Sequence, residues 1–250
     1  MTRILLTVEY DGTDFFGWQI QPEKRTVQGE LETALSSLLG EKITLKASGR
    51  TDAGVHALAQ KAHFDTVSGI PADKLCFAVN VRLPRDVSVR KAEVVPDDFE
   101  ARFSAKKKTY EYRFYFDKIT RPLIDRYAAR VPYSKEKFDE KKARRALEKI
   151  TGTHDFSAFS STGRPVLDAT RTIYRASLVE EKGVFVLSVT GNGFLYNMVR
   201  IVAGTIVEIG LGLIDETNVE KALVSPDRTL LGKTYPARGL CLVSVEYTDR

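Results

Sequence analysis

The order of periodic segments along the chain limits the folds that it can adopt. Residues 3–10 alternate between apolar and polar side chains, which predicts a strand. Thr26 precedes an apolar stripe at helical spacing that stops before Gly40, which predicts a capped helix. Further strands are predicted at 42–47, 57–65 and 87–95, with a second helix from Pro71. The order strand, helix, strand, strand, helix, strand is typical of a ferredoxin-like fold, in which both helices cover one face of an antiparallel sheet.

The second half repeats this order without obvious sequence identity to the first, so the duplication is one of architecture. Its predicted strands are 105–116, 167–179, 183–190 and 239–248, and its predicted helices are 135–150, 195–211 and 216–224. We expect an α+β fold of two ferredoxin-like halves, residues 1–104 and 105–250. The halves are expected to share one mainly antiparallel sheet and to enclose a basic cleft.

The chain has 250 residues with the composition of an ordinary globular protein. No apolar run reaches the length of a membrane span, and the N-terminus lacks the apolar block of a signal peptide, so we expect a cytoplasmic protein. Cys76 and Cys241 lie in apolar stretches and are expected to be buried thiols. The three histidines do not pair with Cys or Glu at metal-ligand spacing, so no metal site is expected.

A net charge of +5 suits a polyanionic partner, and the clustering of the charge is more informative than its size. Lys106, Lys107 and Lys108 are consecutive, and several arginines follow them. The run indicates a surface for nucleic acid or, alternatively, a solvated face.

The stretch from Gly49 to Ala57 is the leading candidate for a reactive site. Asp52 lies between Gly49 and Gly54, whose backbone freedom allows a loop to approach a ligand closely. A loop aspartate that caps a turn is the alternative, and this stretch alone does not decide between them.

Three further residues have both a functional and a structural interpretation. Trp18 and Tyr110 are candidates for stacking on an exposed base, although each can also be a core aromatic, the interpretation we favour for Trp18. Arg200 lies in the middle of the apolar segment 195–211, where a buried guanidinium needs a carboxylate partner or a polar cleft. Asp52 is the partner we favour, with Glu208 or exposure to solvent as the alternatives.

Six motifs together point to a known family. They are YDGTDFFGWQ (Tyr10–Gln19), GRTDAGVHA (Gly49–Ala57), FEARFSAKKKTYEY (Phe99–Tyr112), GTHDFSAF (Gly152–Phe159), GNGFLYNMVR (Gly191–Arg200) and ARGLCLVSVEY (Ala237–Tyr247). In this set and order, the chain resembles the tRNA pseudouridine synthases of the A family. It departs from the family pattern at Glu100, where histidine is usual, and at Tyr196-Asn197, where histidines are frequent.

The resemblance implies an isomerase, a homodimer without a cofactor or metal, that acts on uridines 38, 39 and 40 in the anticodon stem-loop of tRNA. Asp52 would be the nucleophile, Tyr110 would contact the uracil, and Arg200 would be the ion-pair partner of Asp52. Arg50 would contact RNA, and Trp18, Lys106 and Lys107 are further candidates for substrate binding. An ionised carboxylate can add to the sugar or base, or remove a ribose proton, and the sequence does not choose among these routes.

Two other classes of function are weighed against this one. A non-catalytic RNA-binding protein would also use two ferredoxin-like modules, but the glycine-aromatic strand frequent in such modules is absent. A carboxylate-dependent glycosidase or nuclease would need a second acid, for which Asp11 or Asp14 would be the candidates.

Overall fold

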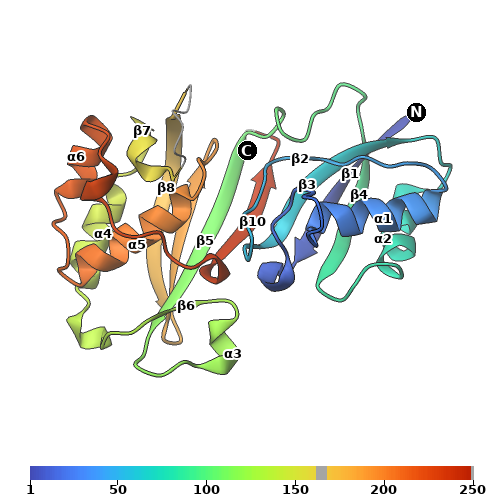
Figure 1. Cartoon of the computed structure of the whole chain (residues 1–250). Coiled ribbons are helices and arrows are strands. Elements are labelled where there is room, and N and C mark those ends of the chain that lie inside the picture. The colour runs from blue at the N-terminus through green and yellow to red at the C-terminus, as the bar shows by residue number, and fades with distance from the viewer. Residues whose placement is uncertain (162–167, 249–250) are drawn as a thin grey trace. The chain divides into compact units, whose positions relative to one another are not determined.

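A computed structural model describes residues 1–161 and 168–248 of the chain (Figure 1). The chain divides into two compact units, Met1–Lys106 with the residues from Cys241 onward, and Lys107–Leu240. The boundary expected from the sequence lies after residue 104, with the last strand in the second half. In the structure the last strand is grouped with the first unit and pairs with a strand there, and hydrophobic periodicity does not specify a strand's partner.

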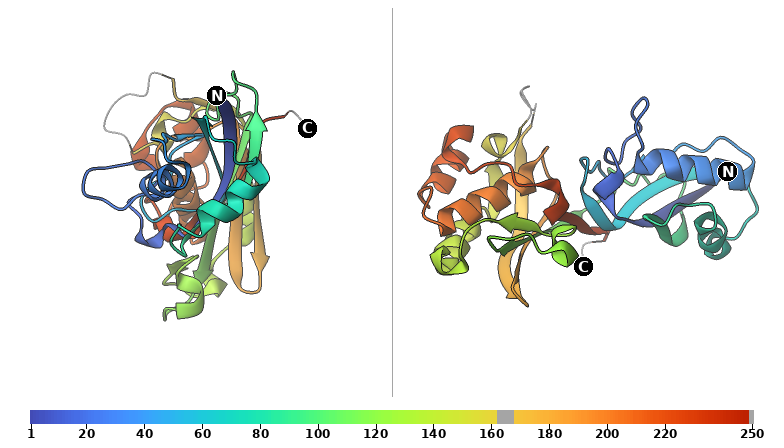
Figure 2. Two further views of the ribbon diagram at one scale, coloured as in Figure 1. Left: turned by 90° about the vertical axis from the view of Figure 1, so that its right-hand side faces the viewer. Right: turned by 60° about the horizontal axis from the view of Figure 1, so that its bottom comes forward.

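The first unit has the strand order of a ferredoxin-like fold. Its elements are β1 (Thr2–Tyr10), α1 (Val27–Leu39), β2 (Lys46–Ala47), β3 (His56–Thr66), α2 (Ala72–Asn80), β4 (Val87–Val95) and β10 (Leu240–Glu246). β1 lies between β3 and β4 and is antiparallel to both, β2 is antiparallel to β3, and β10 is parallel to β3. The two helices lie on the same side of these strands (Figure 2, left).

Local signals explain the elements of the first unit. The apolar face expected for β1, Ile4, Leu6, Val8 and Tyr10, is buried, as the alternation predicts. Thr26 caps α1 by accepting a hydrogen bond from the Gly29 amide, and Gly40 ends the helix in the left-handed conformation (φ 69°).

The strand predicted at 42–47 is reduced to the two residues of β2. Ile43 donates its amide hydrogen to Ser36 Oγ (3.0 Å), and Leu45 donates to Glu32 Oε1 (2.8 Å). Side chains of α1 therefore take the backbone donors that a longer strand would use.

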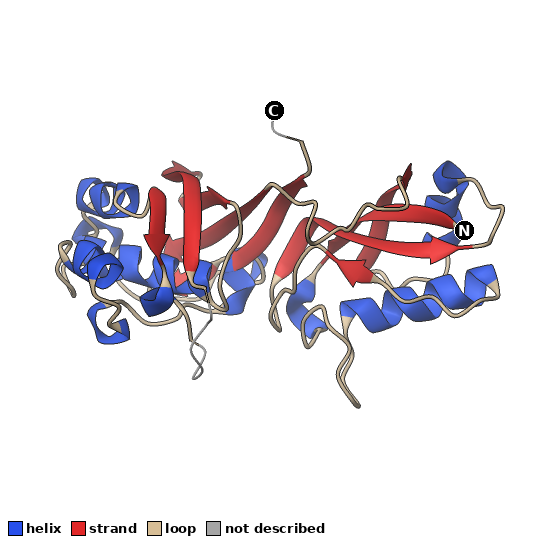
Figure 3. Cartoon of the chain, turned by 90° about the horizontal axis from the view of Figure 1, so that it is seen from above, coloured by secondary structure: helices blue, strands red, loops and turns tan. Residues whose placement is uncertain are grey.

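The second unit combines an antiparallel sheet with four helices in its described residues (Figure 3). Its elements are β5 (Lys107–Phe116), α3 (Pro122–Asp125), β6 (Ala129–Val131), α4 (Glu140–Glu148), β7 (Gly152–Asp155), β8 (Thr170–Glu181), β9 (Val184–Gly191), α5 (Met198–Gly210) and α6 (Asn218–Val224). The sheet order is β5-β9-β8-β7, with β6 parallel to β5. Lys182 and Gly183 lie between β8 and β9 and both have positive φ, which tight turns between antiparallel strands favour. Residue 167 of the predicted strand 167–179 lies outside the described residues.

Two predicted helices of the second unit begin later than expected. Asp139 caps α4 by accepting from the Lys142 amide, so the helix expected from residue 135 begins at Glu140. Asn197 has a φ of 60°, which prevents the helix expected from residue 195 from starting before Met198. Arg200 therefore lies in the first turn of α5 and not in its middle.

The predicted α+β class and mainly antiparallel pairing are confirmed. The basic cleft between the halves stays a prediction. Cys76 and Cys241 are both partly exposed, which corrects the expectation of buried thiols. No helix formed by residues 1–161 and 168–248 is both long and apolar enough to cross a membrane.

Candidate active site

The loop that carries Asp52, residues 49–55, is fixed at its start by side chains of neighbouring segments. We call these residues the Asp52 loop. The buried Ser48 donates from Oγ to Gln60 Oε1 (2.8 Å), and Gln60 Nε2 donates to the Gly49 carbonyl (2.9 Å). Gln60 belongs to β3 and is fully buried, so the regular sheet sets the position at which the loop begins.

Both sides of Asp52 are also held through the backbone. Thr51 Oγ1 lies 2.7 Å from the Tyr10 hydroxyl, and the Thr51 carbonyl accepts from the Trp18 amide (3.1 Å). On the other side, the Val55 amide donates to the Asp52 carbonyl (3.2 Å). Burial raises the pKa of Tyr10, so its hydroxyl stays protonated. The Asp52 residue itself is partly exposed on this restrained loop.

Two glycines of the aromatic-rich segment let it pack directly on the Asp52 loop. A Cβ at Gly12 would lie 2.0 Å from the Val55 carbonyl oxygen, and one at Gly17 would lie 2.6 Å from the Thr51 oxygen. Gly17 also has a φ of +85°, which favours glycine. Sequence reasoning missed this support, although the two glycines of YDGTDFFGWQ were its visible signal.

Other residues near the loop serve as scaffold. Trp18 is 2% exposed and its ring centroid lies 6.1 Å from that of Tyr10, which favours the core interpretation over base stacking. His56 Nδ1 accepts from the Gly12 amide (3.0 Å) and lies 3.2 Å from Asp11 Oδ1. Asp11 Oδ1 also accepts from the amide and hydroxyl of Thr13. Because these contacts use Asp11 as a structural acceptor, they do not support Asp11 as the second catalytic acid of a hydrolase.

Two of the predicted RNA-contacting cations in the first unit are solvent-exposed. Arg50 is exposed beside Thr51 and Asp52, and Lys106 is exposed where the chain leaves the unit. The Lys106 amide donates to the Glu246 carbonyl (2.8 Å), so its backbone is fixed while its side chain is accessible.

Tyr110 lies in the second unit on β5, opposite Val189 of β9. It is partly exposed, and its ring meets the edge of Phe194 with a centroid distance of 5.2 Å. Tyr112 and Phe114, farther along the strand, are fully buried and supply the core contacts. Lys107 lies at the start of the same strand, and its Nζ is 5.8 Å from the Tyr174 ring centroid.

Arg200 is positioned by two hydrogen bonds within the second unit. Nε donates to the Tyr235 carbonyl (2.7 Å), and Nη1 donates to Asn197 Oδ1 (2.6 Å). The residue is partly exposed, which is compatible with the polar cleft or the exposure to solvent considered from the sequence. Glu208, the alternative partner, lies 3.7 Å from Lys233 Nζ. Sequence reasoning missed the role of Asn197; its only sequence signal is the residue type, since asparagine tolerates the positive φ that this position has.

Asp52 and Arg50 thus lie on one loop of the first unit, whereas Tyr110 and Arg200 lie on β5 and α5 of the second unit. An ion pair between Asp52 and Arg200 stays a prediction. In the described ranges, His, Cys, Asp and Glu side chains form no group of three that could hold a metal ion.

Comparison with known proteins defines the class of protein first. A family model described as "tRNA pseudouridine synthase" matches residues 6–104 and 146–248. Proteins called "tRNA pseudouridine synthase A" are similar over nearly the whole chain. That of Caldicellulosiruptor bescii is 47% identical, that of Caldicellulosiruptor saccharolyticus 46%, and that of Bacillus licheniformis 43%. Each comparison covers 99% of this chain and all of the relative.

The class is thus that of enzymes that isomerise a nucleoside within RNA. The chain belongs to the tRNA pseudouridine synthase family. This assignment favours an enzyme over the non-catalytic RNA-binding protein and the hydrolase that the sequence left as alternatives.

Proposed function

We propose that the enzyme converts uridines 38, 39 and 40 of the tRNA anticodon stem-loop to pseudouridine, with Asp52 as the nucleophile. The observation that carries this proposal is the Asp52 loop itself. Its backbone is fixed on both sides of a partly exposed carboxylate. A chain that matches the family throughout its length thus carries its motif aspartate on a restrained loop.

The reaction exchanges one bond for another and requires no external reagent. The bond between C1′ and N1 breaks, the uracil turns, and C1′ bonds to C5. C5 then loses its proton, and N1 gains one. A carboxylate on a restrained backbone stays oriented toward the reacting nucleotide throughout these steps, which lowers the entropic cost of the chemistry. No cofactor has a role in this scheme.

The other site residues orient the substrate and the nucleophile. Arg200 pairs with Asp52 and keeps its carboxylate oriented, while the hydrogen bonds to Tyr235 and Asn197 hold the guanidinium in place. Tyr110 stacks on the uracil, and its contact with Phe194 restricts its ring. Arg50, Lys106 and Lys107 neutralise phosphates. The target base has to leave its stack to reach Asp52, as in other enzymes that modify bases.

The assembly and location follow from the same resemblance. We propose a cytoplasmic homodimer. Light scattering on the purified chain tests the dimer, because a mass near twice 28.0 kDa is expected and a monomer at all concentrations contradicts it.

Carbodiimide mapping of a tRNA transcript after incubation with the enzyme tests the substrate assignment. Reverse-transcription stops are expected at uridines 38, 39 and 40, and not in a transcript with cytidines at these positions. If stops appeared only at other uridines, the assignment of positions 38, 39 and 40 would be wrong. If no tRNA gave any stop, the proposed pseudouridine synthase activity would be wrong.

A further inference from the structure

We propose that the exposed pair Arg102–Phe103 is a docking platform for an unpaired nucleotide of the substrate RNA. The pair lies in residues 99–106, which we call the Phe103 turn. The inference rests on the proposed tRNA substrate and adds a binding surface to it.

The ring and the cation of this pair are displayed together. Phe103 is 80% exposed, and the Arg102 guanidinium carbon lies 5.6 Å from its ring centroid. A base can stack on such a ring, while the guanidinium reaches a neighbouring phosphate or continues the stack. A single exposed aromatic residue is ordinary on a protein surface, so the exposure of Phe103 alone does not indicate a binding site.

The backbone directly before this pair is held from both sides. Ala101 is fully buried directly before Arg102. Its amide donates to His63 Nδ1 (3.2 Å), and its carbonyl accepts from the Tyr247 hydroxyl (3.1 Å). Because His63 belongs to β3 and Tyr247 follows β10, two strands of the first unit hold one residue of the turn. Both polar backbone groups of Ala101 are thus satisfied by side chains.

The turn is also closed on itself. The Ser104 amide donates to the Glu100 carbonyl (2.8 Å), and the Glu100 amide donates to Ser104 Oγ (3.2 Å). Arg102 and Phe103 lie within this closed loop. Their side chains are therefore displayed on an ordered backbone, which lowers the entropic cost of binding a nucleotide.

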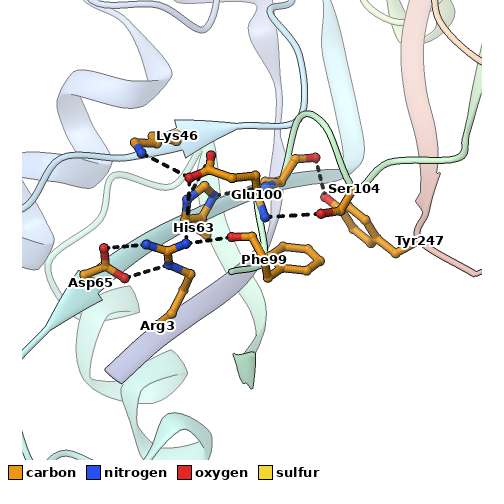
Figure 4. Close-up of polar contacts among 9 residues, drawn as sticks. Arg3, Lys46, His63, Asp65, Phe99, Glu100, Ser104 and Tyr247 are labelled. Carbon is orange, nitrogen blue, oxygen red and sulfur yellow. Dashed lines mark hydrogen bonds and ion pairs between the residues drawn. The ribbon is translucent and has the colours of Figure 1, made fainter. Parts of the chain in front are cut away.

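Ion pairs hold the turn to the sheet (Figure 4). Glu100 lies 3.2 Å from Lys46 and 3.7 Å from Arg3, measured between nitrogen and oxygen atoms. Arg3 also donates to the Phe99 carbonyl (2.9 Å) and pairs with Asp65 (2.7 Å). Glu100 and Asp65 are thus both paired with cations of the sheet.

The remaining charge at the turn suits a polyanion. Arg102 and Lys106 are exposed on either side of Phe103, and the Lys46 side chain is 62% exposed. Asp97 and Asp98 precede the turn and are both exposed, and Asp97 interacts electrostatically with Arg3. The turn leads without interruption into Lys107 and Lys108. An aromatic ring flanked by cations is the combination that binds single-stranded nucleic acid.

A matched pair of substitutions tests the platform. Phe77 lies on α2 in the same unit and is 79% exposed, so Phe77→Ala removes an equally exposed ring elsewhere. Both substitutions are made in the full chain, alone and with Asp52→Asn, which allows binding to be measured without turnover. Binding of an unmodified tRNA transcript is measured by filter binding, and kcat and KM by tritium release.

Phe103→Ala is expected to weaken tRNA binding about tenfold and to raise KM similarly, with kcat nearly unchanged. Phe103→Trp should restore binding, and Phe77→Ala should leave both parameters unchanged. Equal binding by Phe103→Ala and the parent enzyme, or equal losses in the two alanine variants, would overturn the platform. The proposed function would still stand in either case if the parent enzyme forms pseudouridine.

Discussion

The Asp52 loop and the Phe103 turn are both held by β3, but by different forces. The Asp52 loop is fixed by buried neutral groups, since Gln60 and Tyr10 bond its neighbourhood and Gly12 packs on Val55. The Phe103 turn is fixed by one neutral anchor at Ala101 and by partly exposed ion pairs around Glu100.

This difference matches what each loop has to do. An error of about 1 Å in the position of a reacting group can cost on the order of 100-fold in rate, so the loop that carries the proposed nucleophile needs contacts that salt and pH do not weaken. A surface that stacks on a base tolerates small displacements. Exposed ion pairs contribute little stability but are sufficient to orient such a surface.

Among the variants that compare the two loops, the largest effect is expected when the packing of the Asp52 loop is broken. In Gly12→Ala, the new Cβ would lie 2.0 Å from the Val55 oxygen, so the loop has to move. We expect a loss of about 1–3 kcal/mol in the free energy of unfolding and on the order of 100-fold in kcat. Urea unfolding and tritium release measure the two quantities.

Gly69→Ala is the control for this substitution, because nothing lies within 4 Å of a Cβ at Gly69. It should leave kcat unchanged. A Gly12→Ala enzyme as active as Gly69→Ala would show that the close contact is unimportant for the chemistry.

A smaller effect is expected from the pH response of the Phe103 turn. Burial lowers the pKa of His63, against the attraction of Glu100 and Asp65 and together with the repulsion of Arg3 and Lys46. The neutral His63 ring accepts a hydrogen bond from the Ala101 amide. The stability that this hydrogen bond contributes is therefore fully present above the pKa of histidine in the unfolded chain, about 6.5. It is lost as the pH falls through the lower folded pKa.

His63→Asn should therefore flatten the acid dependence of stability. Asparagine retains an acceptor for the Ala101 amide but does not titrate. Between about pH 7.5 and 5, the parent protein should lose more of its free energy of unfolding than the variant does. Urea unfolding at several pH values measures this difference, and parallel curves would refute the role of His63.

The smallest effect concerns Lys106, an exposed cation of the Phe103 turn. The logarithm of the tRNA binding constant falls linearly with the logarithm of the salt concentration. Lys106→Ala should make this decline shallower by about 0.7–0.9, the value for one phosphate contact, with kcat unchanged. Lys74→Ala, at an exposed position on α2, is the control. Identical slopes for the two variants would leave Lys106 as part of a solvated face.

Much of the fold could be predicted because its signals are local. The alternation in β1 and the cap of α1 specify both elements from adjacent residues. The segment 42–47 was mispredicted because its amides bond to side chains of Glu32 and Ser36, which periodicity does not report. The start of α5 depends on one backbone angle at Asn197.

The candidate site residues could be predicted from their types, but the contacts that hold them in place could not. Asp52 is visible as a carboxylate between glycines, whereas the contacts of Gly12 and Gly17 need the folded loop. The anchor of Ala101 joins residues 38 and 146 positions away in the chain, so no local pattern reveals it.

Tritium release from tRNA labelled at C5 of uridine, at saturating enzyme, tests the role of Asp52 most directly. Asp52→Asn replaces the carboxylate with a neutral amide at nearly constant volume. We predict that the variant binds tRNA about as tightly as the parent enzyme but releases tritium at least about 10⁴-fold more slowly. Release at the parental rate by Asp52→Asn would contradict the assignment of Asp52 as the nucleophile.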